Sequence, residues 1–428
     1  MSASYFFLLS DPNVQYVALG AMLLTGSSAL MGTFALLSKK SLVGDAIAHA
    51  VLPGVCLGFI LAGTKEPLWI LAGAFLTGAL SVYLIDFIVH NSHIKEDTAI
   101  GLVLSVMFGA GIVLLTAIQK TGNAAQSGLD QYLFGRAAAI NRQDLLVFGT
   151  TSVLIMALVI VFFRSFTLLA FDRHFAHALG FNVKFIQFIQ TTLIVLAVVI
   201  GIQAVGVVLM AAILITPAAA ARYWCNSVKT MLWLSSAFGM ISGLCGALIS
   251  YAAPAMPTGP WIVVVASVIA FVSLLVAPEK GMLSRSLRQR RLQQTIAQEN
   301  LLKTLYKLGE KNEDFLHERT AQEIMRNLKS ARPQKLLRQL LKQGYVERNN
   351  NHWKLTEAGY LRAQRIVKIH RLWELYLTTY MNIAPDHVHD DAETIEHLLT
   401  PELEKELERQ LGYPSTDPHQ SQIPYRKT

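Results

Sequence analysis

Long apolar stretches, separated by short polar segments, occupy most of the chain up to residue 278. Runs of about 17 to 25 apolar residues are long enough to cross a bilayer as helices. The pattern predicts an all-α membrane bundle of nine spans, or of eight if one of the short second and seventh spans is broken or re-entrant. The predicted spans are residues 14–37, 47–63, 67–90, 98–119, 144–163, 184–203, 205–222, 229–251 and 260–278.

The hydrophobic period changes after residue 278. Apolar residues at helical spacing predict an amphipathic helix in 293–312, and a helix, a turn and a basic helix of about 332–343 follow. Two short strand patterns, "GYVERN" and "HWKLT", flank a turn at Asn349 to Asn351. Helix, turn, basic helix and β-wing are typical of a winged helix-turn-helix. We expect a membrane domain (1–278), a basic linker (279–295), this winged domain (296–362) and a mostly helical last domain (363–428).

Composition supports a membrane protein with a polar C-terminal part. The chain is 53% hydrophobic and only 15% charged, which is too apolar for an ordinary soluble enzyme. Lys and Arg are more frequent in loops on the side of the polar part than in the opposite loops, and this bias predicts that the C-terminal part is cytoplasmic. We expect a multi-pass protein of the bacterial inner membrane.

Two ionisable residues lie at the start of the second span, in "SLVGDAIAHAVLPG". Asp45 and His49 are four residues apart, on one helix face, and Pro53 and Gly54 follow at a point where the helix can be interrupted. Ionisable groups in a membrane usually face a partner, a cavity or a permeating ion. A carboxylate with an imidazole suits a divalent transition metal. The alternative is that the two bond each other and cap the helix. Asp86 is expected to make an interhelical hydrogen bond or to lie near the interface.

Five motifs give the membrane part a family resemblance: "SLVGDAIAHAVLPGVCLGFIL", "EDTAIGLVLSVMFGAGIVLL", "DQYLFGRAAAINRQDL", "AFDRHFAHALGF" and "QAVGVVLMAAILITPAAAA". In these motifs and in their order and spacing, the membrane part resembles the permease subunit of manganese, zinc and iron ABC importers. The resemblance implies a homodimeric or heterodimeric pore, an extracytoplasmic metal-binding protein and Asp45 and His49 as metal ligands in the pathway. It also implies that a separate ATPase meets the loop with Asp172, Phe175, Ala178 and Gly180. The chain has no G-x-x-x-x-G-K-[ST] loop, so we expect no ATPase activity of its own.

The predicted recognition helix carries side chains that suit phosphates and base edges. The alternative is a winged helix that docks on another protein. The candidate DNA-binding residues are Arg332, Gln334, Lys335, Arg338 and Gln339.

Histidines and carboxylates recur at one-turn spacing in the last domain. His370 and Glu374 are four apart, and a second cluster follows in "VHDDAETIEHLL". Two helices of this kind can converge on a divalent ion with nitrogen and oxygen ligands. The second cluster comprises His389, Glu393, Glu396 and His397.

Residues 295–424 resemble the diphtheria-toxin-repressor family of metal-dependent transcriptional repressors, which dimerise on operator DNA. The resemblance assigns His370, Glu374 and His389 to one metal site, and Glu393, Glu396 and His397 to another. Two positions depart from the family: Asn300 stands where a Met or Asp ligand is expected, and Lys303 where the manganese-responsive branch has Glu. The second site therefore lacks a strong ligand.

These patterns lead to one hypothesis and two alternatives. We expect an importer permease for iron or manganese, with zinc as a further candidate, fused to a repressor that uses the same metal as co-repressor and is released by proteolysis near the linker. In the first alternative, the C-terminal part binds metal and gates transport without touching DNA. In the second, the membrane part is a secondary transporter or channel that needs no ATPase.

Overall fold

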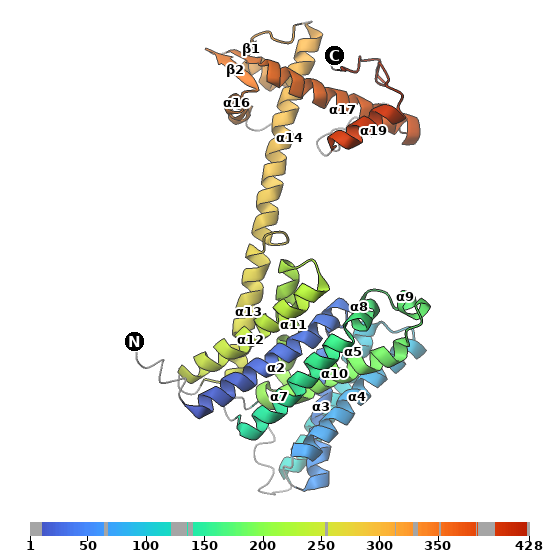
Figure 1. Cartoon of the computed structure of the whole chain (residues 1–428), viewed down its shortest axis with the longest axis vertical. Helices are drawn as coiled ribbons and strands as arrows, with labels where there is room; N and C mark the ends of the chain where they lie inside the picture. Colours follow the sequence, from blue (N-terminus) through green and yellow to red (C-terminus); the bar gives the residue numbers. More distant parts are fainter. Residues whose placement is uncertain are drawn as a thin grey trace. The chain divides into compact units, whose positions relative to one another are not determined.

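The computed structural model describes residues 11–63, 67–120, 135, 140–252, 256–312, 314–327, 333–350, 352–381, 383 and 399–425. The chain divides into two compact units, a membrane unit (Met1–Arg285) and a C-terminal unit (Ser286–Thr428). Figure 1 shows the helices of both units.

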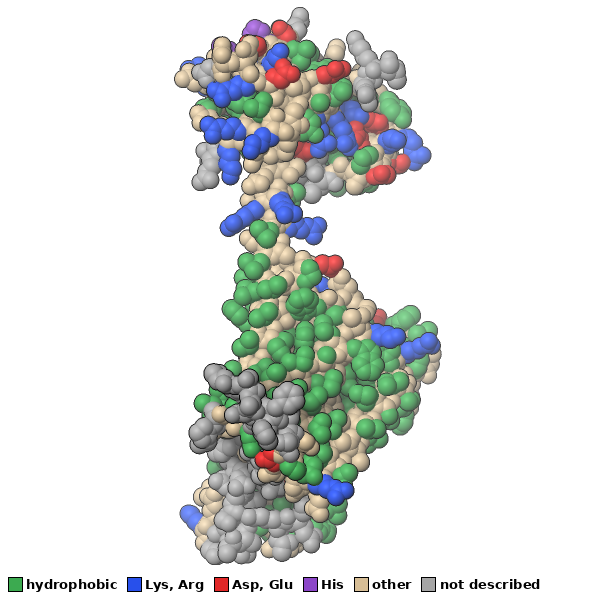
Figure 2. Space-filling model, turned by 60° about the vertical axis from the view of Figure 1, so that its left-hand side comes forward, with side chains coloured by type: hydrophobic (Ala, Val, Ile, Leu, Met, Phe, Trp, Pro, Cys, Tyr) green, Lys and Arg blue, Asp and Glu red, His purple; other side chains and the backbone are tan. Residues whose placement is uncertain are grey.

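The membrane unit confirms the predicted spans. Within the described residues, nine helices are long and apolar enough to cross a membrane. In Figure 2, hydrophobic side chains are spread over the described surface of this unit and charged side chains there are few, as a lipid-facing surface requires. The nine helices are α2 (Pro12–Leu37), α3 (Val43–Ala62), α4 (Pro67–Asn91), α5 (Glu96–Lys120), α7 (Arg142–Val161), α10 (Val183–Val205), α11 (Val207–Trp224), α12 (Val228–Ala252) and α13 (Thr258–Val276). Two short helices, α8 (Phe163–Phe171) and α9 (Arg173–Ala178), lie between α7 and α10.

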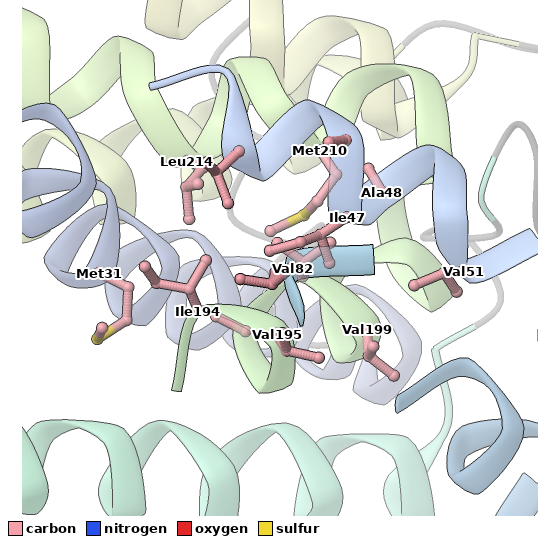
Figure 3. Packing of buried hydrophobic residues seen from close by; sticks show 14 of the residues in the cluster. Met31, Ile47, Ala48, Val51, Val82, Ile194, Val195, Val199, Met210 and Leu214 are labelled. Carbon is pink, nitrogen blue, oxygen red and sulfur yellow. The ribbon is translucent and has the colours of Figure 1, made fainter. Parts of the chain in front are cut away.

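A core of apolar side chains from α2, α3, α4, α10 and α11 holds these helices together (Figure 3). Met31, Ile47 and Met210 are 0% exposed. Small residues allow the helix backbones to approach closely, as is common in membrane bundles. A Cβ atom on Gly32 would lie only 1.7 Å from the carbonyl oxygen of Leu214. Glycine is therefore required where α2 meets α11.

Proline does not interrupt α3. The sequence allowed for a break at Pro53 and Gly54, but the helix continues through both to Ala62. Gly54 instead serves packing, because its missing Cβ would lie 2.1 Å from the carbonyl oxygen of Gly73 on α4. Neighbouring helices stabilise a membrane helix that contains proline, and α3 packs against α4, α5 and α11. Pro217 likewise lies inside α11.

The C-terminal unit contains the predicted winged helix. The strands form an antiparallel sheet in the order β1–β3–β2, and the wing turn includes Asn350 with a φ of 51°. Leu302, Leu337, Val346, Trp353 and Val367 belong to one buried cluster. The elements of this part are most of α14 (Met282–Lys311), β1 (Arg319–Thr320), α15 (Ala321–Asn327), α16 (Pro333–Lys342), β2 (Val346–Asn349) and β3 (His352–Leu355). Helix α14 includes most of the segment expected as a basic linker.

Two further helices, α17 (Glu357–Met381) and α19 (Pro401–Gln410), complete the described part of this unit. Lys368 of α17 joins them, with its ammonium 2.6 Å from Glu404 of α19. Burial alone lowers the pKa of Lys368, but hydrogen bonds to Glu404 and Glu408 outweigh burial and raise it. The ammonium therefore stays charged, and the ion pairs hold α17 against α19.

Candidate functional site

Asp45 and His49 form a half-buried pair at the start of α3. Oδ1 of Asp45 is 3.6 Å from Nε2 of His49, which is longer than a good hydrogen bond. The Asp45 side chain is 39% exposed and that of His49 is 19% exposed. No side-chain hydrogen bond caps the start of α3 in the described part of the chain. The carboxylate and the imidazole thus share a helix face without forming a short hydrogen bond to each other.

The ring of His49 is fixed on one side and incompletely bonded on the other. It packs edge-on against Phe108 of α5, with ring centroids 4.8 Å apart. Its Nδ1 is buried and has no hydrogen-bond partner among the residues that the structure describes. A buried nitrogen without a partner costs free energy in the absence of a ligand. The pair offers two of the ligand atoms that a divalent metal needs. Further ligands have to come from elsewhere, because the described residues contain no group of three or more His, Cys, Asp or Glu side chains that could hold an ion.

A charged network lies where α2 ends and α5 begins. Lys40 Nζ is 3.4 Å from Asp86 and 3.6 Å from Glu96. Asp86 also accepts a hydrogen bond of 3.3 Å from Gln187 of α10. The expected interhelical hydrogen bond of Asp86 is confirmed. Its pairing with Lys40 was not predicted, because no periodicity in the sequence links residues so far apart.

The loop between α7 and α10 presents apolar side chains to the outside. Asp172 caps α9 by accepting a hydrogen bond of 2.9 Å from the backbone N–H of Phe175. Ala176 is buried, and Gly180 ends the turn with a φ of +83°. Exposed apolar residues on such a loop are typical of a protein contact. The exposed apolar residues here are Phe171, Phe175, Ala178, Leu179 and Phe181.

Helix α16 exposes three of the five candidate DNA-binding side chains. Gln334, Lys335 and Arg338 lie on its outer face, opposite the buried leucines. Gln339 is half-buried and accepts a hydrogen bond of 3.1 Å from Gln298 of α14. It is therefore held inside the unit. Arg332 lies outside the described residues.

The second histidine–carboxylate pair lies in α17 and is fully buried. Nε2 of His370 is 3.1 Å from Oε1 of Glu374. Nδ1 of His370 is 3.1 Å from the ammonium nitrogen of Lys303 on α14. An ammonium cannot ligate a metal, and both ring nitrogens are engaged. In this arrangement the pair does not fit a metal ion.

The other predicted regulatory ligands, His389, Glu393, Glu396 and His397, lie outside the described residues. Asn300, which replaces an expected ligand, has its amide oxygen buried without a hydrogen-bond partner in the described part. The metal site proposed for this second cluster stays a prediction.

Comparison with known proteins covers both units. Residues 10–277 match the model of the ABC 3 transport family, and residues 356–425 match that of the iron dependent repressor, metal binding and dimerisation domain. The chain is 41% identical over 385 residues to the manganese transport system membrane protein MntC of Bacillus subtilis. The aligned region covers 90% of this chain and 88% of that protein.

Two further matches concern the membrane unit. The zinc transport system membrane protein TroC of Treponema pallidum is 42% identical over 285 residues, covering 67% of this chain and 96% of that protein. The solved structure of PsaBC from Streptococcus pneumoniae in complex with Fab has a TM-score of 0.60 and 33% identity, over 68% of this chain and 100% of that chain.

Proposed function

The chain belongs to the ABC 3 transport family and carries an iron-dependent-repressor domain at its C-terminal end, and on this basis we propose that it is the permease of a divalent-metal importer with a built-in DNA-binding regulator. Relatives named as manganese and zinc transport proteins support manganese or zinc as cargo. Iron stays a candidate, because an imidazole and a carboxylate bind all three ions.

The observation that carries the transport proposal is the incompletely bonded Asp45–His49 pair. Its partly exposed carboxylate is costly inside a membrane. A second permease chain packed on this face would cover the carboxylate and supply further ligands. We therefore propose a homodimeric or heterodimeric pore with Asp45 and His49 as ligands of the transported ion, fed by an extracytoplasmic metal-binding protein.

A separate ATPase is proposed to dock on the loop that holds Asp172, Phe175, Ala178 and Gly180. Phe175 is 53% exposed there, and the chain has no phosphate-binding loop of its own. The test is uptake of radioactive manganese by cells that express the importer with and without the ATPase. Uptake without the ATPase would favour a secondary transporter or channel.

The C-terminal unit is proposed to be cytoplasmic and to bind operator DNA as a dimer through α16. Lys335 and Arg338 on its exposed face suit the phosphates and base edges of a major groove. The test uses the full-length protein in detergent and fluorescence anisotropy with its own promoter DNA at fixed salt, because the phosphate contribution depends strongly on salt. Each metal is titrated in turn.

The double variant Lys335→Ala, Arg338→Ala should lose DNA binding. The slope of the logarithm of the binding constant against the logarithm of the salt concentration should fall in magnitude by about one for each lost phosphate contact. Lys405→Ala removes an exposed lysine of α19 and should leave binding unchanged. If the double variant alters metal uptake and the wild type has no DNA affinity, the C-terminal unit is a transport gate and not a repressor.

Release by proteolysis is proposed within residues 279–295. From Arg285 to Thr295 the side chains of α14 are all exposed, and exposed charged segments are accessible to proteases after local unwinding. Blots with a C-terminal antibody should show a fragment of the C-terminal unit. Full-length protein alone under every metal condition would contradict release.

A further inference from the structure

Helices α14 and α17 enclose a polar cluster that contains its own cation. Lys303, His370 and Glu374 are 4%, 2% and 2% exposed. The ammonium of Lys303 contacts Nδ1 of His370 at 3.1 Å, and Nε2 of the same ring contacts Glu374 at 3.1 Å. The three groups form a continuous chain from cation to imidazole to carboxylate.

The hydrogen-bond chemistry of this chain leaves His370 without a lone pair for a metal. An ammonium only donates, so Nδ1 of His370 accepts from Lys303, and Nε2 carries the proton that is donated to Glu374. A metal ion at Nδ1 would have to displace the ammonium and would then lie beside a second positive charge in a buried place. Charges in a buried place are screened little by solvent, so that arrangement is unfavourable.

Ion pairs within the protein also join α14 to α17 on both sides of this cluster. Arg362 of α17 pairs with Glu299 of α14. Arg371 of α17 makes two hydrogen bonds to Glu310 of α14, at 2.7 and 2.9 Å. Ion pairs therefore join the two helices on both sides of the Lys303–His370 contact.

We infer that the ammonium of Lys303 is a permanent internal cation that takes the place of a metal ion at the His370–Glu374 pair. The pair is a structural clamp between α14 and α17, and it does not sense metal. Any metal response of the C-terminal unit comes from other residues. The inference goes beyond the proposed function and is independent of DNA binding.

The test counts the Mn²⁺ ions bound per chain. Full-length protein in detergent is stripped with a chelator and dialysed against manganese chloride, and bound metal is measured by mass spectrometry, in the absence of DNA. His370→Gln should bind as much Mn²⁺ as the wild type. Loss of one Mn²⁺ per chain in His370→Gln would overturn the inference.

The reverse experiment restores an acidic ligand. Lys303→Glu should bind one Mn²⁺ more per chain than the wild type, and adding His370→Gln should remove that gain. Lys307→Glu makes the same charge change one turn along α14, on an exposed side chain, and should bind no extra metal. A folded Lys303→Glu protein without the gain would contradict the inference. If this variant does not fold, the comparison of His370→Gln with the wild type decides.

Discussion

Two histidine–carboxylate pairs with the same spacing of four residues lie in different units of the chain, and their surroundings differ. In the membrane unit, Asp45 and His49 are 3.6 Å apart and partly exposed, and one ring nitrogen is buried without a partner in the described structure. In the C-terminal unit, His370 and Glu374 are 3.1 Å apart and buried, and Lys303 engages the remaining nitrogen.

The difference shows that the spacing alone does not define a metal site. Four residues of helix bring an imidazole and a carboxylate to one face in both cases. The neighbouring groups decide what the pair does. A nitrogen without a hydrogen-bond partner and an accessible carboxylate favour reversible binding of an ion, whereas a fixed ammonium favours a permanent contact within the protein.

Removal of one carboxylate tests the clamp most severely. Glu374→Ala removes the buried carboxylate from this charged cluster, so we expect a loss of ~3–5 kcal/mol in the unfolding free energy of the C-terminal unit. Hydrogen exchange of α17 in the full-length protein measures this loss. Glu357→Ala, on an exposed residue of the same helix, should change it by less than about 1 kcal/mol. Equal protection in the two variants would contradict the clamp.

Overpacking of α3 tests whether the membrane pair depends on helix packing. A valine at Gly54 would collide with the carbonyl oxygen of Gly73, so Gly54→Val should destabilise the membrane unit by ~1–3 kcal/mol and lower uptake. Thermal unfolding in detergent and metal uptake measure the two effects. Gly101→Val is the control, because a Cβ at Gly101 meets no atom within 4 Å. A similar loss in both variants would show that α3 packing is not the cause.

The smallest effect is expected at the Lys40–Asp86 ion pair of the membrane unit. Lys40 and Asp86 have side chains that are 18% and 36% exposed, and their closest atoms are 3.4 Å apart. Such partly exposed pairs contribute at most about 1 kcal/mol. A double-mutant cycle with Lys40→Ala and Asp86→Asn measures the coupling. A Lys40–Asp86 coupling free energy as large as the loss of unfolding free energy in Glu374→Ala would contradict the account. It would mean that the burial of Lys303 does not make its contacts stronger than those of Lys40.

Much of the fold could be predicted from the sequence because it follows from local patterns. The apolar runs located the nine spans of the described chain, and the strand and turn patterns located β2, β3 and the turn at Asn350. The predicted recognition helix corresponds to α16. Hydrophobic period and turn chemistry act within a few residues, so one sequence is enough to find them.

The contacts that decide the chemistry could not be predicted in this way. The family resemblance put Lys303 at the position of a metal ligand, but it did not predict the contact with His370, 67 residues away along the chain. The close approach of Gly54 to Gly73 and the burial of Gln339 depend in the same way on how whole helices pack. Long-range packing has no local signal in a single sequence.

Uptake of radioactive manganese tests the central claim most directly. Wild type, His49→Gln and His370→Gln are compared in cells that lack their own importer and express the ATPase and the extracytoplasmic binding protein. Loss of a metal ligand should lower uptake about tenfold or more in His49→Gln, whereas His370→Gln should transport at the wild-type rate. Unchanged uptake in His49→Gln, or an equal loss in His370→Gln, would contradict the assignment of transport to the membrane pair alone.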